Sequence, residues 1–357
     1  MSRIDADAEW LEADRLGGFA SGTVSGIRTR RYHALLLTAT TPPAGRMVLV
    51  NGFDAWLEMP RGAFAISSQR YGPDVIHPDG SSRIESFEYE PWPCWRYRID
   101  NDIVIEQELF VPKGESAVFI SWKVISASDH DAKLKVRPFL SGRDFHSTHH
   151  ENGAFRFEAQ QNGERVTFRS YEGVPAVVAY SNGGYAHNPT WYRNFLHSEE
   201  QARGLDATED LASPGVFEFS LSRKPAVLML AAEGHAITDI ESIEARHAQV
   251  RTIEQARRKY FASPLERAAD AYLVKRGKGK TLIAGYPWFG DWGRDTFIAL
   301  RGLCIATGHL GEARDILLQW AGTVSEGMLP NRFPDQGEQP EFNSVDASLW
   351  YIIAVND

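Results

Sequence analysis

The stretch Gly285–Leu303, GYPWFGDWGRDTFIALRGL, decides how the rest of the chain is interpreted. Aromatic, acidic and arginine side chains crowd its first half, ahead of an apolar helical segment: Trp288, Phe289, Asp291, Trp292, Arg294 and Asp295. This combination suits a sugar ring, because aromatic faces cover its C–H groups while charged groups hydrogen-bond its hydroxyls. It also suits a helix N-terminus, with Asp291 or Asp295 as the cap and the tryptophans in a core. The stretch alone leaves both interpretations open.

Composition narrows the class of protein. The 357 residues exceed a usual single domain, so two domains are expected. The formal net charge of −9 disfavours nucleic acid and anionic membranes as main partners. The two cysteines, Cys94 and Cys304, are far apart in the sequence. The first residues contain no apolar signal-peptide region, and no run of 18 apolar residues occurs. These features predict a soluble, cytoplasmic protein with reduced thiols.

Residues 1–236 predict an N-terminal domain made of strands. Apolar side chains recur at every second position, as at Val118, Ile120, Trp122 and Val124, and turn signals such as Asn152-Gly153 separate these runs. Many short strands without crossover helices predict a large antiparallel β-sandwich. Two segments do not fit: residues 17–37 begin Gly-rich, and residues 184–214 have little periodicity and are expected to form a long loop.

Helical patterns follow. Residues 237–263 are mostly charged and predict a helical linker lying along a surface. Beyond it, residues 264–357 predict helices after Pro264 and at 295–306, 313–324 and 346–355. Helices alternating with loops of sugar-binding composition indicate the first part of an (α/α)6 toroid. A complete toroid needs roughly 200 residues. We therefore expect a β + α multidomain chain that ends inside an incomplete (α/α)6-barrel catalytic domain, with a small helical cap on the sandwich as the alternative.

Four stretches of the sequence carry a family resemblance. Residues 285–303, LPNRF at 329–333 and NSVDASLW at 343–350, together with residues 17–37, resemble the bacterial-type glycogen debranching enzymes, the amylo-α-1,6-glucosidase group. The resemblance covers nearly the whole chain and implies a distant kinship with glucoamylases. It implies an inverting glycoside hydrolase that removes α-1,6-linked glucose from glycogen or another α-glucan.

The same resemblance assigns roles to individual residues. Asp346 falls at the position of the general acid, whereas the family's general base has no counterpart in these residues. By the same resemblance Trp292, Arg294 and Asp295 would line the subsite of the terminal glucose. We also expect Trp288, Asp291 and Asn331 to bind substrate. The resemblance implies no metal and no cofactor.

Asp346 and Asp295 compete for the acid role. An inverting glycosidase uses one carboxylic acid on the leaving oxygen and one carboxylate on the attacking water. Burial beside Trp350 would raise the pKa of Asp346, while the helix N-terminus would lower it. Taken by itself, the sequence favours Asp346 as a plain helix cap, and only the resemblance reverses this. Arg294 should keep Asp295 ionised.

Several other groups of residues are weaker candidates for a functional site. The histidines His146, His149 and His150 are expected to be structural or substrate-facing. The run RGKGKT at 276–281 lacks the earlier glycine of a phosphate loop and is rejected as one. The arginines Arg28, Arg30 and Arg31 either steer anions or lie on a solvated edge strand. Trp191 and Tyr192 either stack on a glucan or fill a core.

Alternative functions remain open at this stage. An inverting glycoside phosphorylase needs only one protein acid, because phosphate attacks the sugar, so dependence of sugar release on phosphate would identify it. A glucoamylase-like α-glucosidase differs in linkage preference. A glucan-binding module without catalysis is the hypothesis from another class. The oligomeric state is left unassigned.

Overall fold

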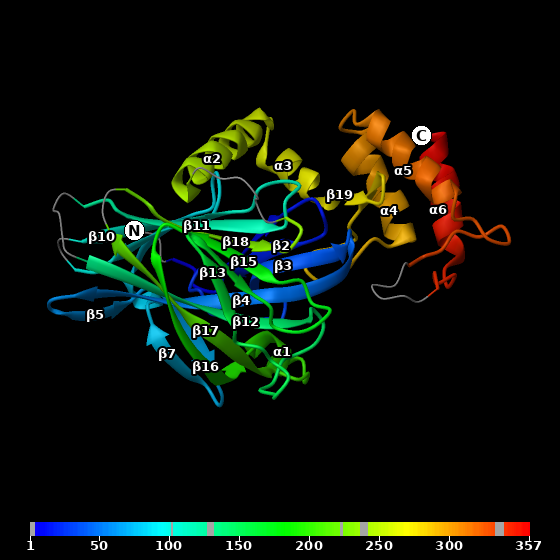
Figure 1. The fold of residues 1–357 in the computed structure, drawn as a ribbon. Helices are drawn as coiled ribbons and strands as arrows, with labels where there is room; N and C mark the ends of the chain where they lie inside the picture. The colour runs from blue at the N-terminus through cyan, green and yellow to red at the C-terminus, as the bar shows by residue number, and fades with distance from the viewer. Residues whose placement is uncertain (1–3, 101–102, 127–131, 222–223, 236–241, 333–338) are drawn as a thin grey trace. The chain divides into compact units, whose positions relative to one another are not determined.

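The computed structural model describes residues 4–100, 103–126, 132–221, 224–235, 242–332 and 339–357 (Figure 1). The chain divides into two compact units, each assembled from three segments. The β unit comprises Met1–Glu12, Phe19–Leu37 and Met47–Ala256, and the helical unit comprises Ala13–Gly18, Thr38–Arg46 and Arg257–Asp357. Among the described residues, no helix is long and apolar enough to cross a membrane.

Two large antiparallel sheets make up most of the β unit. Within the described residues, the first sheet has ten strands in the order β1-β2-β3-β4-β12-β17-β16-β6-β7, with β5 paired to β4. Its strands are β1 (Glu9–Ala13), β2 (Phe19–Thr23), β3 (Ala34–Thr41), β4 (Ala44–Met59), β5 (Gly62–Ala65), β6 (Ser68–Tyr71), β7 (Val75–Asp79), β12 (Ala132–Asp144), β16 (Gly184–Leu196) and β17 (Thr208–Leu221).

The second sheet has eight strands in the same described ranges, in the order β13-β14-β15-β18-β11-β10-β9-β8. Its strands are β8 (Ile84–Glu88), β9 (Cys94–Arg98), β10 (Val104–Phe110), β11 (Ala117–Val124), β13 (Ala159–Asn162), β14 (Arg165–Phe168), β15 (Val177–Ser181) and β18 (Ala226–Ala232). A short 3-10 turn at Ser81–Arg83 precedes β8.

The two sheets share one hydrophobic core, so the prediction of a large antiparallel β-domain is confirmed. Alternate residues of strands from both sheets enter that core because successive side chains of a strand point to opposite faces. The inward-facing residues include Leu49, Leu57, Leu134, Val136 and Phe217 from the first sheet and Ile105, Leu109, Ile120, Trp122 and Leu228 from the second. In β11 both faces are buried: Val118, Ile120 and Trp122 enter this core, whereas Phe119 enters a second cluster on the opposite face.

The opposite face of the eight-stranded sheet is covered by a helix. α2 (Ile243–Tyr260) buries Ile243 and Val250 in a cluster with Phe110 and Met229 of that sheet. Arg251 of the same helix makes two hydrogen bonds to Glu108, of 2.9 and 2.8 Å. The charged helix that the sequence predicts after residue 237 therefore packs on the sheet through a thin apolar stripe. Residues 236–241 lie outside the described part of the chain.

The prediction of a long loop at residues 184–214 is wrong. The segment forms β16, the short helix α1 (Ser198–Ala202) and the first part of β17. Its periodicity is weak because the pairing of β16 with β17 shifts register twice, between His187 and Thr190 and between Tyr192 and Phe195. Each such irregularity reverses which face the following side chains occupy.

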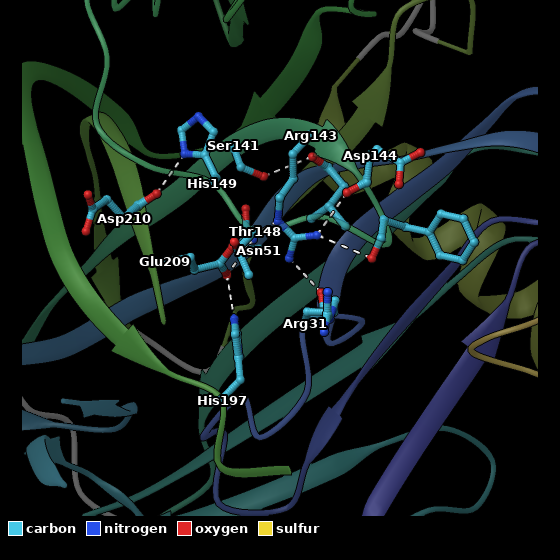
Figure 2. A network of polar contacts seen from close by, with 12 residues as sticks. Arg31, Asn51, Ser141, Arg143, Asp144, Thr148, His149, His197, Glu209 and Asp210 are labelled. Carbon is cyan, nitrogen blue, oxygen red and sulfur yellow. Dashed lines mark hydrogen bonds and ion pairs between the residues drawn. The ribbon is translucent and has the colours of Figure 1, made fainter. Parts of the chain in front are cut away.

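A buried polar network organises one end of the β unit (Figure 2). Glu209, at the start of β17, is fully buried and accepts hydrogen bonds from Arg143 Nε at 2.9 Å and Asn51 Nδ2 at 3.2 Å. His197 Nε2 lies 2.9 Å from the same carboxylate, and Arg143 also donates to the carbonyl oxygen of Arg31 at 2.6 Å. Burial acts to raise the pKa of Glu209, but the charges of Arg143 and His197 outweigh it and lower the pKa. The carboxylate of Glu209 therefore stays ionised and connects His197, which follows β16, to Arg143 of β12 and Asn51 of β4.

The helical unit is built around four helices in the described ranges. They are α3 (Pro264–Tyr272), α4 (Gly293–Leu300), α5 (Leu310–Ala321) and α6 (Val345–Asn356), and α4 continues into a π-helical turn at Arg301–Ile305. Phe297 of α4, Ile316 and Trp320 of α5 and Ala354 of α6 are buried in one core. All four helices were predicted, although α5 begins and ends three residues earlier than expected.

A small hairpin lies between α3 and α4 in the sequence and was not predicted. β19 (Leu273–Arg276) pairs with β20 (Gly279–Leu282). The run RGKGKT is the turn and second strand of this hairpin, in agreement with its rejection as a phosphate loop. Strands of four residues rich in lysine and glycine carry too little periodicity to be read from sequence.

Candidate sugar-binding site

The residues of the quoted stretch lie at the beginning of α4 in the helical unit. Trp292 is the residue before the helix, and it forms a β-bridge with Arg332 of the LPNRF motif. Arg332 in turn bridges to Glu341, which leads into α6. Three motifs far apart in the sequence are thus joined side by side, and the start of α4 and the start of α6 come together.

Asn331 fixes this junction. Its side chain is buried, with its Oδ1 accepting from the backbone N–H of Arg294 at 3.3 Å and its Nδ2 donating to Asn343 Oδ1 at 3.2 Å. Its carbonyl oxygen accepts from the N–H of Gly293 at 2.7 Å. Asn331 therefore satisfies N–H groups that a helix N-terminus leaves without intrahelical partners. The structure uses this residue to position the site, whereas the sequence placed it among the sugar contacts.

Arg294 brings two carboxylates together. Its Nη1 lies 3.7 Å from Asp346 Oδ2, and its Nε lies 4.0 Å from Asp295 Oδ2. All three side chains are between two-fifths and one-half exposed. The result is an open surface with one cation between two anions, each with oxygens or N–H groups left to bind hydroxyls.

Asp346 does not have the environment expected of a general acid. The hydrogen bond from Ser344 and, after it, the charge of Arg294 lower the pKa of Asp346. The expected burial beside Trp350 is absent at this carboxylate, whose side chain is 48% exposed. In this structure Asp346 is an ionised group, and its proton affinity is set by Ser344 and Arg294.

Aromatic rings flank these charges. Trp292 is half-buried and lies edge-on to Phe289, with ring centroids 6.2 Å apart, and Phe289 is 49% exposed. The Arg332 guanidinium lies 5.5 Å from the centroid of the Trp292 ring. Trp288 is half-buried in the preceding loop. The rings of Trp292 and Phe289 therefore offer flat apolar surface next to the charged group of Arg332.

Asp291 lies apart from this surface. It is 4% exposed and pairs with Arg276 of the β19–β20 hairpin. Burial raises the pKa of Asp291, although Arg276 acts to lower it. The carboxylate is committed to an internal ion pair, which differs from the sugar contact expected from the sequence.

Sequence reasoning missed two residues of this surface, Arg332 and Glu341. Arg332 Nη1 donates to Glu341 Oε1 at 3.3 Å, and Glu341 Oε2 accepts from Asn343 Nδ2 at 3.2 Å. An arginine inside the otherwise uncharged run LPNRF was the available signal.

The histidines belong to the β unit. His149 Nδ1 lies 2.7 Å from the carbonyl oxygen of Asp210, and its Nε2 lies 2.7 Å from Tyr171 Oη. His146 Nδ1 lies 3.1 Å from Tyr32 Oη. The ring nitrogens of His149 are thus used in internal hydrogen bonds, and Trp191 stacks on its ring at 5.5 Å.

This fold is glucoamylase-like. A solved structure of a bacterial glucoamylase complexed with acarbose resembles the chain with a TM-score of 0.50 at 12% sequence identity. The similarity covers 99% of this chain and 57% of the glucoamylase.

Sequence comparison gives the family. Residues 8–228 match the family described as glycogen debranching enzyme N terminal, and residues 267–357 match the one described as amylo-alpha-1,6-glucosidase. The chain belongs to the glycogen debranching enzyme family. A glycogen debranching enzyme of Saccharomyces cerevisiae is 39% identical over 82 residues, which are 22% of this chain and 5% of that enzyme. The chain therefore corresponds to a small part of this relative's length.

Proposed function

We propose that the chain belongs to a glycoside hydrolase that removes α-1,6-linked glucose from glycogen or a limit dextrin with inversion. The cluster of Trp292, Arg294, Asp295 and Asp346 binds the terminal glucose, with Asp346 as the proton donor. The observation that carries this is the Arg294 guanidinium within 4.0 Å of both carboxylates and next to an aromatic surface. Family membership supports the substrate class.

Hydroxyl binding accounts for the two carboxylates and the arginine. Asp295 accepts hydrogen bonds from sugar hydroxyls, and Arg294 donates them, while Trp292 and Phe289 cover the C–H face. Trp288 contributes to the same subsite, and Asn331 positions it. Asp291 supports the loop through Arg276.

The proton donor requires a change in Asp346. In the free protein its pKa is lowered, and a general acid works best with a pKa near the operating pH. Substrate seated between Arg294 and Asp346 would displace water and separate the two charges, and both effects raise the pKa of a carboxylic acid. We therefore propose that the substrate itself prepares Asp346 for proton donation.

The helices α3 to α6 are proposed to begin an (α/α)6 toroid in a cytoplasmic enzyme. Large apolar side chains on α5 and α6 are exposed, as neighbours in a helical ring would require. They include Leu318, which is 58% exposed, and Leu349 and Ile352, which are 56% and 63% exposed.

Sugar binding tests the site directly. The protein is titrated with maltotriose while tryptophan fluorescence is recorded, in the native sequence and in Trp292→Ala and Arg294→Ala. Each substitution is expected to weaken binding by about 10-fold or more, because a stacking surface or a charged hydrogen-bond donor is lost. Tyr260→Ala is the matched control, since Tyr260 is 90% exposed at the end of α2. Unchanged affinity in both site variants would place the sugar elsewhere.

The reaction is tested on a limit dextrin. Release of free glucose without phosphate is expected, with the β anomer formed first. Release of glucose 1-phosphate only when phosphate is present would make the enzyme a phosphorylase. If the protein binds maltotriose but releases no sugar with or without phosphate, it is a glucan-binding module without catalysis.

A further inference from the structure

A cavity of about 60 Å³ lies inside the β unit. None of its lining residues belongs to the proposed sugar site. Side chains from both sheets line the cavity. They include the aromatic residues Trp10, Trp95 and Tyr97 and the polar residues Arg28, Asn51 and Gln107. A cavity of this volume holds about two water-sized groups.

Arg28 is buried at this cavity without a hydrogen-bond partner for its guanidinium among the described residues. It is 7% exposed, and its Nε is completely enclosed. Its guanidinium carbon lies over two rings, 4.8 Å from the centroid of Phe195 and 5.9 Å from that of Phe139. Gly52 makes room for it, because a Cβ at that position would lie 2.4 Å from Arg28 Nη1. The interpretation of Arg28 as part of a solvated edge is therefore wrong.

The nearby carboxylates are engaged elsewhere. Glu209 is bonded to Arg143, Asn51 and His197 in the polar network of Figure 2. Asp54 accepts from Ser67 and Gln69, and burial raises its pKa. Neither carboxylate forms an ion pair with Arg28 in the described part of the chain. Arginine keeps its charge in proteins, so Arg28 is a buried cation that interacts electrostatically with Glu209 and Asp54 but receives no hydrogen-bonded carboxylate from the described residues.

Gln107 adds a second donor aimed at the same space. It occupies an inward-facing position of β10 between Ile105 and Leu109, where the alternation calls for an apolar residue. Its Oε1 accepts from the indole N–H of Trp122 at 2.7 Å. Because an indole N–H only donates, the amide oxygen must face it and the Nε2 group must point away. Within the described residues this NH₂ group has no acceptor, although the side chain is buried.

We propose that this cavity is a binding site for a single monovalent anion of chloride size, held by the Arg28 guanidinium and the Gln107 amide. Buried charges in proteins are paired, and a guanidinium without a hydrogen-bonded carboxylate among the described residues favours one bound negative charge. The remaining volume holds a water that donates to Asn51 Oδ1, which is buried and has no other donor among the described residues. A divalent oxyanion does not fit this balance, because its second charge would be left without a partner.

Saturable stabilisation by halide tests the proposal. Thermal unfolding of the protein is followed while sodium chloride replaces sodium gluconate from 1 to 100 mM at constant ionic strength. A ligand that binds only the folded state raises the midpoint in a saturable manner, by about 2 °C for a site filled well above its Kd. Bromide should act like chloride, whereas sulfate and phosphate should not. A midpoint that is the same in chloride and gluconate, or that rises with phosphate alone, would overturn the assignment.

Two variants separate the site from general salt effects. Arg28→Met should abolish the chloride dependence. Arg137→Met is the matched control, because Arg137 also lies over two rings, Trp56 at 5.3 Å and Tyr192 at 5.4 Å, but does not line the cavity. It should keep the full dependence. Equal dependence in both variants would refute the site.

A direct measurement on the unchanged protein guards against a variant that fails to fold. Crystals soaked in bromide are expected to show an anomalous scattering peak in the cavity beside Arg28 and Gln107. Density for water only at that position, without an anomalous signal, would contradict the proposal.

Discussion

Ser344 and Arg294 control the carboxyl group on which the proposed chemistry depends. Ser344 Oγ donates to Asp346 Oδ1, and this bond is the largest influence that lowers the pKa of Asp346. Ser344→Ala should therefore raise that pKa, as seen by carboxyl ¹³C shifts during an NMR titration. Ser348→Ala is the control, because Ser348 bonds the N–H of Leu329 instead. An unchanged titration of Asp346 in Ser344→Ala would show that Arg294 alone holds the carboxyl group ionised.

Kinetics separates the roles of the two aspartates in the active enzyme. Asp346→Asn removes a proton donor, so hydrolysis of a limit dextrin should fall by roughly 10²–10⁴-fold. An activated substrate such as a glucosyl fluoride needs little protonation of its leaving group and should retain far more activity. Asp295→Asn should slow both substrates alike, because its hydroxyl contacts act on the sugar. Equal losses on both substrates for Asp346→Asn would remove it from the acid role.

His33 makes the β unit sensitive to acid. The N–H groups of Thr29 and Arg30 donate to its Nδ1 at 3.2 and 3.4 Å, so the folded state holds the neutral ring. Burial lowers its pKa to about 3, well below the unfolded value near 6.5. The unfolded chain therefore binds the extra proton first as pH falls.

It follows that stability is fully present above about pH 6.5 and declines as pH falls towards 3, by at most about 1.4 kcal/mol per pH unit. Denaturant unfolding between pH 4 and 7 should show a smaller slope for His33→Gln than for the native sequence. The same slope in both proteins would mean that other groups, such as His247, dominate the titration.

At the level of elements, the aromatic loop is fastened to the β19–β20 hairpin by one buried ion pair. Arg276 reaches Asp291 and also lies 5.0 Å from the Trp320 ring. Arg276→Met leaves a buried carboxylate without its partner and should cost about 3 kcal/mol of stability. The double variant Arg276→Met/Asp291→Asn should recover part of this loss. Urea unfolding measures both, and additive losses would show that the pair is not coupled.

Elements with a long regular period were predictable, and short ones were not. The helices after Pro264 and at Ile316 and Trp320 follow from apolar spacing, as do the strands with strict alternation. The β19–β20 hairpin and β16 were missed because one is too short and the other shifts register twice. Local irregularities of this kind are set by pairing partners far away in the sequence.

The candidate site shows the same limit. Its residue types could be predicted, because aromatic and charged groups in one stretch are visible in the sequence. The approach of Arg294 to Asp346 depends on the bridge between Trp292 and Arg332, which no local pattern encodes. The burial of Asp291 was hidden for the same reason, since its partner lies in the hairpin that was missed.

For the whole molecule, the helical unit depends on the N-terminal segments that belong to it. Asp270 of α3 is buried and pairs with Arg15 of the segment Ala13–Gly18 and with Arg257, the latter at 3.2 Å. Asp270→Asn removes the charge that both arginines share and should destabilise the helical unit by about 3 kcal/mol. Glu266→Gln is the control, because Glu266 is exposed at the start of the same helix.

Hydrogen exchange of the helical amides measures this prediction. Protection should fall in α3 and in the β19–β20 hairpin, whose Lys275 N–H donates to the carbonyl oxygen of Arg15 at 2.9 Å. Protection that is lost equally in Glu266→Gln would attribute the effect to the helix start and not to the ion pair.

The interleaved segments also bear on how such a gene can change. Arg15 and Arg46 are translated long before Asp270 and Tyr286, so these contacts form only after more than 200 further residues have been made. No single recombination breakpoint separates the two units, because exchanging the coding sequence after residue 256 would leave the two small segments behind. A helical unit of this kind is expected to be inherited together with its own β unit, and a chimera with a foreign one would need compensating substitutions at residues 13–18 and 38–46.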